Sequence, residues 1–339
     1  MRLIKTEDAV GHVLCHDMTQ IIKDQYKDAR FRKGHVVTEE DIPVLLSMGK
    51  EHLYVWEMTS GMVHENDAAE RLLALCGQEN MIRSGVKEGK IELKAACDGV
   101  FLVDSARLVA VNSQDEVMIA TRKGGMAVRE GDKLAGMRVI PLIIEEEKLR
   151  KAEQAAGDKP LLSLKPYVRK TACIVATGGE VKKGLIKDTF TPVVIDKLKT
   201  YGIETLEVVY SGDGVENVRD AVLAMREKKP DMILCTGGMS VDPDDNTPGG
   251  IRAAGASIIA YGAPVLPGAM FLLGYFDDGM PVMGLPGCVM YAGATVFDLV
   301  LPKIAADVPV TRADLAALGE GGLCLGCKPC HYPICPFGK

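Results

Sequence analysis

The sequence predicts an α/β protein. A three-layer α/β domain follows an N-terminal α/β piece and a small β-rich domain, and a Cys-rich tail ends the chain. From Thr171 onward, short apolar runs alternate with amphipathic segments, which is typical of a sheet with helices on both faces. Glycine-separated segments of alternating hydrophobicity fill residues 81–150. Four cysteines lie close together between Cys324 and Cys335.

Composition restricts the possible function classes. The chain has 339 residues, of which 47% are hydrophobic, so several cores can be buried. The formal charge of -6 argues against a general nucleic-acid binder. No apolar run is long enough to span a membrane, and the N-terminus is too polar for a signal peptide. Six of the ten cysteines are scattered in apolar contexts, so we expect buried thiols in a reducing, cytoplasmic compartment.

The first half of the chain predicts two small domains, 1–80 and 81–150. In the first, Thr38–Pro43 has the pattern of a capped helix start, and Asn66–Cys76 forms an amphipathic helix ended by Gly77. Strands are expected at Val10–Cys15, His35–Thr38 and Leu53–Trp56. In the second domain they are expected at Ile91–Ala95, Gly99–Val103, Leu108–Val111, Val117–Thr121, Ala127–Val128 and Arg138–Ile144.

The main domain boundary is predicted within Lys159–Pro166, which follows a charged helical segment, Glu145–Asp158. The α/β domain then covers 167–307, and the tail covers 318–339. The predicted strands of the α/β domain are Ala172–Ala176, Glu204–Val209, Met232–Cys235, Ser257–Ala260 and Val282–Leu285. Its predicted helices are Thr189–Tyr201, Val215–Lys228, a segment opened by Thr247 and Pro248, and Ala292–Ala306.

The stretch Leu234–Pro248 contains the largest number of candidate functional residues. Gly237 and Gly238 follow a buried strand and allow a sharp turn close to a ligand. Thr247 as N-cap and Pro248 as first helical residue predict a helix start, which suits an anion such as phosphate. The plain alternative is a tight turn between strand and helix. Three aspartates, Asp242, Asp244 and Asp245, would repel an anion unless a cation or a proton-transfer task accounts for them.

Three more loops follow predicted strands. They are Thr177–Glu180, Ser211–Gly214 and Leu285–Cys288, and Asp188 precedes the helix after the first of them. If the strands are parallel, all four loops gather at one edge of the sheet. Backbone N–H groups and carboxylates together suit a phosphorylated ligand with a divalent cation.

These motifs resemble the molybdopterin-binding domain of molybdenum cofactor biosynthesis over about Thr171–Ala306. Thr236–Ser240 matches its Thr-Gly-Gly signature, Asp245–Pro248 follows at the usual spacing, and Leu285–Gly287 matches its Leu-Pro-Gly loop. Thr177–Glu180 matches a second signature. The resemblance implies a site for molybdopterin, or its adenylated form, with Mg²⁺ held by carboxylates. It implies catalytic roles for Asp245 and Asp188. The implied ligand-binding residues are Thr177, Gly178, Glu180, Asp213, Thr236, Gly237, Gly238, Ser240, Asp242, Thr247, Pro286 and Gly287.

The chain also departs from the molybdotransferases of this family. They usually have Asp where Gly179 stands, and Lys-Pro after Pro-Gly, where this chain has Ala269-Met270 after Pro267-Gly268. These departures concern molybdate handling, not ligand binding. The spacing of Thr236–Pro248 is also similar to the adenylyltransferase branch and to the nucleotide-processing competence-damage relatives.

The tail is a second candidate site. Cys324, Cys327, Cys330 and Cys335 have spacing that allows several thiolates to reach one metal, either zinc or an iron–sulfur cluster, with His331 as the alternative fourth ligand. Because the segment has few large apolar residues, we expect a metal to order it. A flexible thiol tail is the alternative.

Two functions remain open. The first is an enzyme of molybdenum or tungsten cofactor synthesis, a transferase that adenylates molybdopterin or inserts metal from molybdate. The second is a non-catalytic molybdopterin binder or carrier whose tail handles metal or redox state. Self-association into a homo-oligomer is expected because relatives of the resembled fold commonly self-associate.

Overall fold

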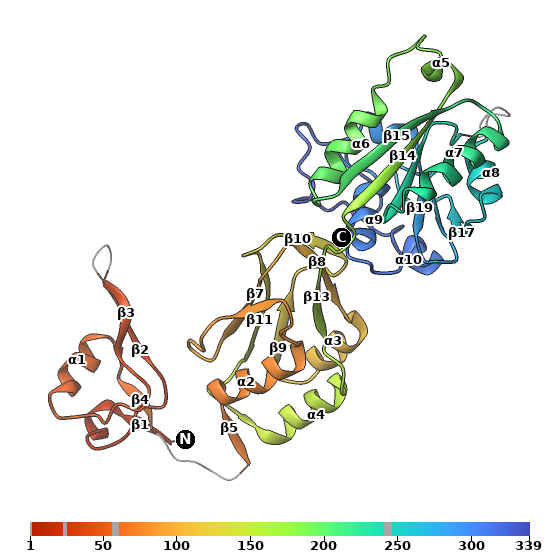
Figure 1. Cartoon of the computed structure of the whole chain (residues 1–339). Coiled ribbons are helices and arrows are strands. Elements are labelled where there is room, and N and C mark those ends of the chain that lie inside the picture. The colour runs from red at the N-terminus through yellow and green to blue at the C-terminus, as the bar shows by residue number, and fades with distance from the viewer. Residues whose placement is uncertain (1, 23–25, 56–60, 241–245) are drawn as a thin grey trace. The chain divides into compact units, whose positions relative to one another are not determined.

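The computed structural model describes residues 2–22, 26–55, 61–240 and 246–339 (Figure 1). They divide into two compact units. Unit 1 contains Met1–Ala96, Leu102–Gly124 and Glu130–Ser163, and unit 2 contains Cys97–Phe101, Gly125–Arg129 and Leu164–Lys339. Among the described residues, no helix is both long and apolar enough to cross a membrane.

The start of unit 1 is built from two antiparallel strand pairs and short helices. Strand β1 (Arg2–Lys5) pairs with β4 (His52–Val55), and β2 (Met18–Ile22) pairs with β3 (Tyr26–Phe31). The helices are η1 (Thr6–Asp8) and α1 (Asp41–Ser47). The strands predicted at Val10–Cys15 and His35–Thr38 are wrong. Only isolated bridges form there, from Val13 to Val36 and from Leu14 to Val55. Leu14 and Val37 are apolar because they are buried in the core, although they lie in loops.

The rest of unit 1 combines a four-stranded sheet with three helices. The sheet order is β6 (Met81–Arg83), β7 (Ile91–Ala95), β11 (Lys133–Val139) and β9 (Val117–Thr121), and β5 (Met62–His64) pairs separately with β12 (Ile143–Glu145). The helices are α2 (Glu65–Cys76), α3 (Ser105–Asn112) and α4 (Glu146–Ala156).

The strand predicted at Leu108–Val111 is wrong, because these residues lie inside α3. The Asp104 carboxylate accepts the Arg107 N–H at 3.1 Å and caps the helix, and the Arg107 guanidinium donates to Ala156 O at 2.7 Å. A cap and an anchor at the first turn therefore outweigh the local β propensity of Val109 and Val111.

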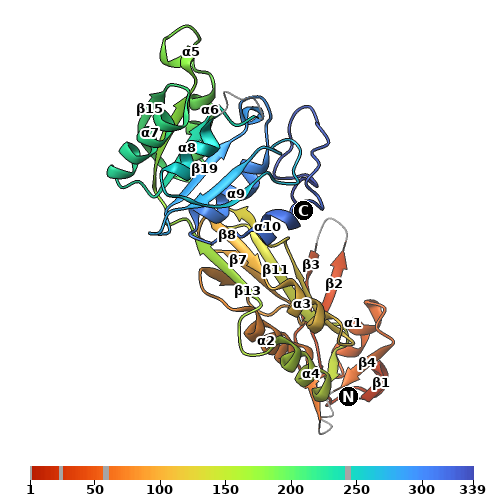
Figure 2. The same cartoon turned by 90° about the vertical axis from the view of Figure 1, so that its right-hand side faces the viewer.

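Unit 2 is organised around a six-stranded sheet with the order β15-β14-β16-β19-β18-β17. Figure 2 labels β15 and β19 of this sheet. Four strands are parallel to one another: β15 (Glu204–Ser211), β14 (Thr171–Thr177), β16 (Met232–Thr236) and β19 (Pro281–Leu285). Strands β18 (Leu272–Tyr275) and β17 (Ser257–Tyr261) complete the sheet in antiparallel pairing. The sequence analysis missed β18. A second sheet of unit 2 has the order β10 (Met126–Val128), β8 (Gly99–Val103), β13 (Leu162–Pro166).

Alternate residues of the central strands enter two different cores. Ala172 and Ile174 of β14 pack with α6 (Phe190–Lys199), α9 (Val296–Ala305) and α10 (Arg312–Ala317) on one face. Cys173 and Val175 pack with α7 (Val215–Glu227) and α8 (Thr247–Ala253) on the other face. The predicted three-layer α/β architecture is confirmed, because only a sheet buried on both faces gives such continuous apolar strands. The final helix begins at Val296, capped by Thr295, and not at Ala292 as predicted.

The Cys-rich tail is ordered by packing against this domain. Its ends meet, since the Gly338 N–H donates to Gly321 O at 2.9 Å. Phe337 is only 2% exposed and joins the core around α9, and the Tyr332 hydroxyl donates to Asp298 O at 3.0 Å. The buried ring and the closed backbone loop hold the segment against the domain, and the expectation that a metal also orders it stays a prediction.

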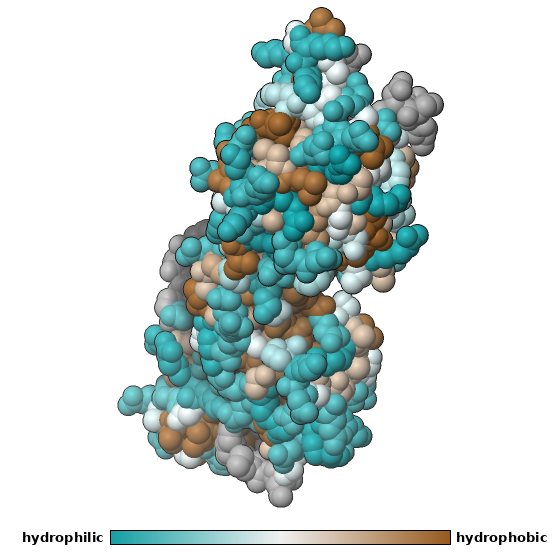
Figure 3. Space-filling view, turned by 45° about the vertical axis from the view of Figure 1, so that its right-hand side comes forward, coloured by the Kyte–Doolittle hydropathy of each residue, from teal (hydrophilic) through white to brown (hydrophobic). Residues whose placement is uncertain are grey.

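Exposed apolar side chains elsewhere are dispersed. Figure 3 shows a face on which hydrophilic residues predominate and hydrophobic residues form small separate patches. Single exposed apolar residues are usual on protein surfaces and need no special explanation.

Replacing Phe337 with Ala tests this account of the tail. The change removes a ring from the core, so we expect the free energy of unfolding to fall by about 3 kcal/mol and the tail to become sensitive to protease. Ile334→Ala is the matched control, because Ile334 lies in the same loop and is 87% exposed. Urea unfolding and limited proteolysis measure both effects. Equal behaviour of the two variants would show that the ring does not hold the tail.

Candidate functional site

The four predicted loops lie at one edge of the sheet of unit 2. Strands β14, β15, β16 and β19 are parallel, so their carboxyl ends point the same way. Figure 1 shows α5 (Gly179–Lys182) beyond the end of β14, on the loop that continues to α6. Open α/β sheets place their ligands at this edge.

The turn after β16 is tightly packed against β14 and α8. Gly237 and Gly238 have φ values of +82° and +56°, which favour glycine. A Cβ added to Gly237 would lie 2.8 Å from Thr177 Oγ1, and one on Gly238 would lie 2.7 Å from Thr247 Oγ1. Both glycines are therefore required by backbone conformation and by space.

Two threonine side chains connect this turn to its neighbours. The Thr177 hydroxyl donates to Thr236 O at 2.9 Å, the Thr247 hydroxyl donates to Gly237 O at 2.9 Å, and the two hydroxyl oxygens lie 3.1 Å apart. Thr247 was predicted as the N-cap of α8, which is wrong. Asn246 holds that position, and Thr247 is the first helical residue with its side chain turned to the Gly237 carbonyl.

The loop after β14 is bound to the loop after β15. Gly178, with φ +137°, donates its N–H to Ser211 O at 3.3 Å. The Gly179 N–H donates to Asp213 Oδ2 at 3.0 Å. These contacts bring the predicted residues Thr177, Gly178 and Asp213 together with Thr236, Gly237, Gly238 and Thr247. Glu180 lies in α5, and its side chain is outside the part of the structure that is described.

Asp188 serves the start of α6. Its Oδ1 accepts the N–H groups of Phe190 and Thr191 at 2.9 and 3.0 Å, and the Tyr210 hydroxyl donates to its Oδ2 at 3.3 Å. Partial burial tends to raise the pKa of Asp188, but hydrogen bonds from Thr191, Phe190 and Tyr210 outweigh it, so the pKa lies below its usual value. The carboxylate is thus charged and helix-capping, and a catalytic role stays a prediction.

The remaining predicted site residues lie on the same edge or outside the described residues. Pro286 and Gly287 follow β19, where η2 (Gly287–Met290) begins, and Thr189 Oγ1 lies 3.0 Å from Met290 Sδ. Ser240 is exposed at the end of the glycine turn. The Tyr261 hydroxyl donates to Met239 O at 3.0 Å. Asp242 and Asp245 fall outside the described residues, so the structure does not place them.

Tyr210 and Tyr261 are site residues that sequence reasoning missed. Tyr261 is the last residue of β17 and Tyr210 the second-last of β15, and each hydroxyl reaches a site loop. A tyrosine directly after a predicted strand was the available signal, because its hydroxyl can donate a hydrogen bond to a neighbouring loop.

The tail cysteines are distributed over a docked loop. Cys324 and Cys335 are partly buried against the α9 core, whereas Cys327 and Cys330 are exposed, as is His331. Within the described ranges, no group of three or more His, Cys, Asp or Glu side chains is arranged to hold a metal ion. The predicted convergence of four ligands is therefore not found in this conformation.

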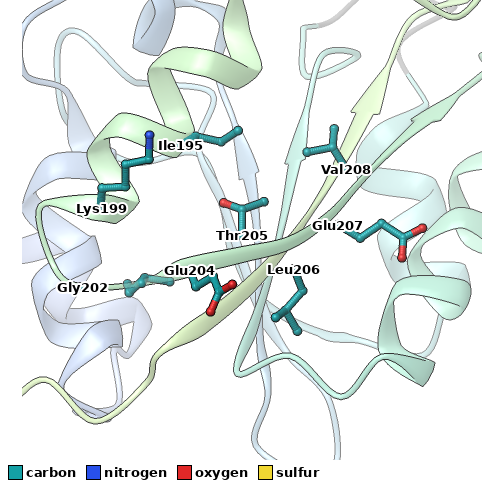
Figure 4. Close-up of a pocket in the computed structure, with 9 residues that line it drawn as sticks. Ile195, Lys199, Gly202, Glu204, Thr205, Leu206, Glu207 and Val208 are labelled. Carbon is teal, nitrogen blue, oxygen red and sulfur yellow. The ribbon is translucent and has the colours of Figure 1, made fainter.

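A groove of about 630 Å³ lies elsewhere on unit 2 (Figure 4). It is lined by the first part of β15 and by the end of α6, including Lys199, Glu204 and Leu206. The glycine turn and the loop after β14 do not line it, and its lining stops before the carboxyl end of β15. The groove is thus separate from the candidate site.

Comparisons with known proteins match two stretches of the chain. Residues 173–306 match a family described as a probable molybdopterin binding domain, and residues 3–57 match a domain of unknown function, DUF8806. A "CinA-like protein" of Mycobacterium tuberculosis is 33% identical over 76 residues, which is 22% of this chain and 18% of the relative. The chain therefore spans under a fifth of that curated relative's length.

Two solved structures illustrate the likeness. A molybdopterin biosynthesis enzyme MoaB from Thermus thermophilus is 17% identical, with 42% of this chain and 98% of that chain covered and a TM-score of 0.36. A molybdopterin biosynthesis MoeA protein from Pyrococcus horikosii is 14% identical, with 76% and 82% covered and a TM-score of 0.34. These likenesses are too distant to carry an argument, so the family assignment rests on the match of residues 173–306. Residues 173–306 of this chain belong to the molybdopterin-binding domain family of molybdenum cofactor biosynthesis.

Proposed function

We propose that unit 2 binds molybdopterin, or its adenylated form, at the edge formed by the loops after β14, β15 and β16, and that the protein acts in molybdenum or tungsten cofactor biosynthesis. The family of residues 173–306 supports the pterin ligand. The observation that carries the location is the Gly237-Gly238 turn, whose backbone is held against Thr177 and Thr247 with no room for a side chain. Such a turn leaves backbone groups open to a closely approaching phosphate.

The reaction that we propose is a transfer on bound molybdopterin, either adenylation or metal insertion from molybdate. Asp245 and Asp188 are the candidates to hold Mg²⁺, which would neutralise negative charge on the phosphate during the transfer. Asp188 is charged by virtue of its lowered pKa, so it can face a cation, although its oxygens already accept three hydrogen bonds. A reducing compartment such as the cytoplasm suits the free thiols of the chain.

The second candidate is a non-catalytic molybdopterin binder or carrier. The tail favours it, because two exposed cysteines are presented on a loop that is already anchored to the domain. Turnover distinguishes the candidates. Purified full-length protein with molybdopterin, Mg²⁺-ATP and molybdate either yields an adenylated or metal-loaded pterin or returns the ligand unchanged. Size-exclusion chromatography with light scattering tests the expected homo-oligomer.

Replacement of Gly238 with Val is expected to abolish molybdopterin binding while unit 2 stays folded. The new side chain would meet Thr247 at the centre of the turn. Gly279→Val is the matched control, because Gly279 also has a positive φ, +80°, but nothing lies within 4 Å of its added Cβ. Calorimetric titration gives the affinity and circular dichroism gives the fold. If Gly238→Val binds as tightly as the control, the ligand lies elsewhere.

Asp245→Asn is expected to lower turnover more than binding. Loss of one positioned charge at a reaction centre commonly costs on the order of 10²–10³ in rate. Asp196→Asn serves as control, because Asp196 is exposed and pairs only with Lys199 among the described contacts. Single-turnover rates and dissociation constants are measured for both. Full activity in Asp245→Asn would remove this residue from the catalytic role.

For the tail, we propose a bound zinc ion or iron–sulfur cluster with ligands from Cys324, Cys327, Cys330, Cys335 and His331. The cysteine spacing supports it, and loading would require the loop to rearrange around its anchors. Metal analysis of anaerobically purified protein should find about one zinc, or iron with sulfide, per chain. Deletion of residues 321–339 should remove the metal. A metal-free protein whose four tail thiols all react with a thiol probe would contradict the proposal.

A further inference from the structure

Lys182 lies at the junction of two loops of the candidate site. It ends α5, where its N–H donates to Gly178 O at 3.0 Å, so the helical turn starts directly on the glycine loop after β14. Its side chain crosses toward the loop after β15. The Lys182 Cδ and Nζ atoms both lie 3.8 Å from the position of a Cβ added to Gly212. The ammonium group therefore lies beside Gly212 of the second loop.

Asp213 fixes this arrangement from the other side. Its Oδ2 accepts the Gly179 N–H and lies 2.6 Å from the position of a Cβ added to Gly179. The carboxylate thus occupies the space that any side chain at residue 179 would need. Because Lys182 is three residues after Gly179 in the same helical turn, this bond also holds the lysine in position.

The negative charges at this edge explain why a phosphate would need Lys182. The carboxylates of Asp188 and Asp213 both border the described part of this edge, and they oppose a phosphate. An anionic ligand therefore needs a cation at the same edge. Among the ion pairs of the described residues, none involves Lys182, and its side chain is exposed. Its ammonium is available for an incoming anion.

We propose that Lys182 binds the phosphate of the ligand in unit 2 and that Asp213 positions the loop which carries it. The proposal rests on the proposed function, because it assumes a phosphorylated ligand at this edge. The chemistry is that of a phosphomonoester, supplied either by the pterin or by a nucleotide. A lysine ammonium recognises such a group as a point charge with three donors.

Lysine variants of the full-length protein test the proposal, with molybdopterin and AMP as separate probes in calorimetric titrations. Lys182→Ala should weaken binding about tenfold, because a charge-assisted hydrogen bond is lost, and should reduce the sensitivity of binding to NaCl. Lys182→Arg should restore most of the affinity. Lys183→Ala is the matched control. Lys183 is the next residue and is also exposed, but none of its atoms is among those nearest to the added Cβ of Gly212.

The probes separate the possible phosphate sources. Weakened binding of molybdopterin alone assigns Lys182 to the pterin phosphate, and weakened binding of AMP alone assigns it to a nucleotide. Equal effects of Lys182→Ala and Lys183→Ala, or no effect of either, overturn the assignment. If Gly238→Val still abolishes binding in that case, the proposed site stands without Lys182. If the wild-type protein binds neither probe, the proposed function and this assignment fail together.

Discussion

The Thr177 side chain joins three pieces of chain that are distant in sequence. Its hydroxyl donates to Thr236 O, lies beside the Thr247 hydroxyl, and packs under Gly237. The end of β14, the turn after β16 and the start of α8 therefore share one small polar cluster. Thr236 and Thr247 are almost fully buried, so these hydrogen bonds are shielded from water and leave the turn little freedom. The other loops at this edge of the sheet are positioned relative to this polar cluster.

Much of the α/β domain could be predicted because its strands are buried on both faces. β14, β15, β16 and β19 stand where apolar runs predicted them, and their shared direction follows from the helices between them. β18 was missed because it is a run of only four residues. It joins the sheet through antiparallel pairing, so no crossover helix marks it in the sequence. In unit 1 the run Leu108–Val111 was misassigned, since its helical state depends on Asp104 and on a bond to distant Ala156.

The candidate site could be predicted only as a set of loops. Parallel strands gather their carboxyl ends whatever the side chains, so the neighbourhood of Thr177, Gly178 and Gly238 followed from the pattern. The individual contacts did not follow. That Asp213 takes the Gly179 N–H, or that Asp188 caps α6, depends on rotamers and loop lengths that no spacing encodes. The docking of the tail could not be predicted for a similar reason, because a single ring, Phe337, packs against α9 and not within its own segment.

Unit 2 takes two short segments, Cys97–Phe101 and Gly125–Arg129, from the middle of unit 1. Tyr167 illustrates the dependence, since its hydroxyl donates to Gly99 O at 2.8 Å. A ribosome makes these segments long before it makes α9, which packs near β10. Strand β8 can pair with β10 and β13 as soon as residue 166 has been made, so only the contact of this small sheet with α9 waits for the C-terminal part of the chain. The last contacts of this sheet are therefore completed late in synthesis, because the residues of unit 2 are not contiguous in the chain.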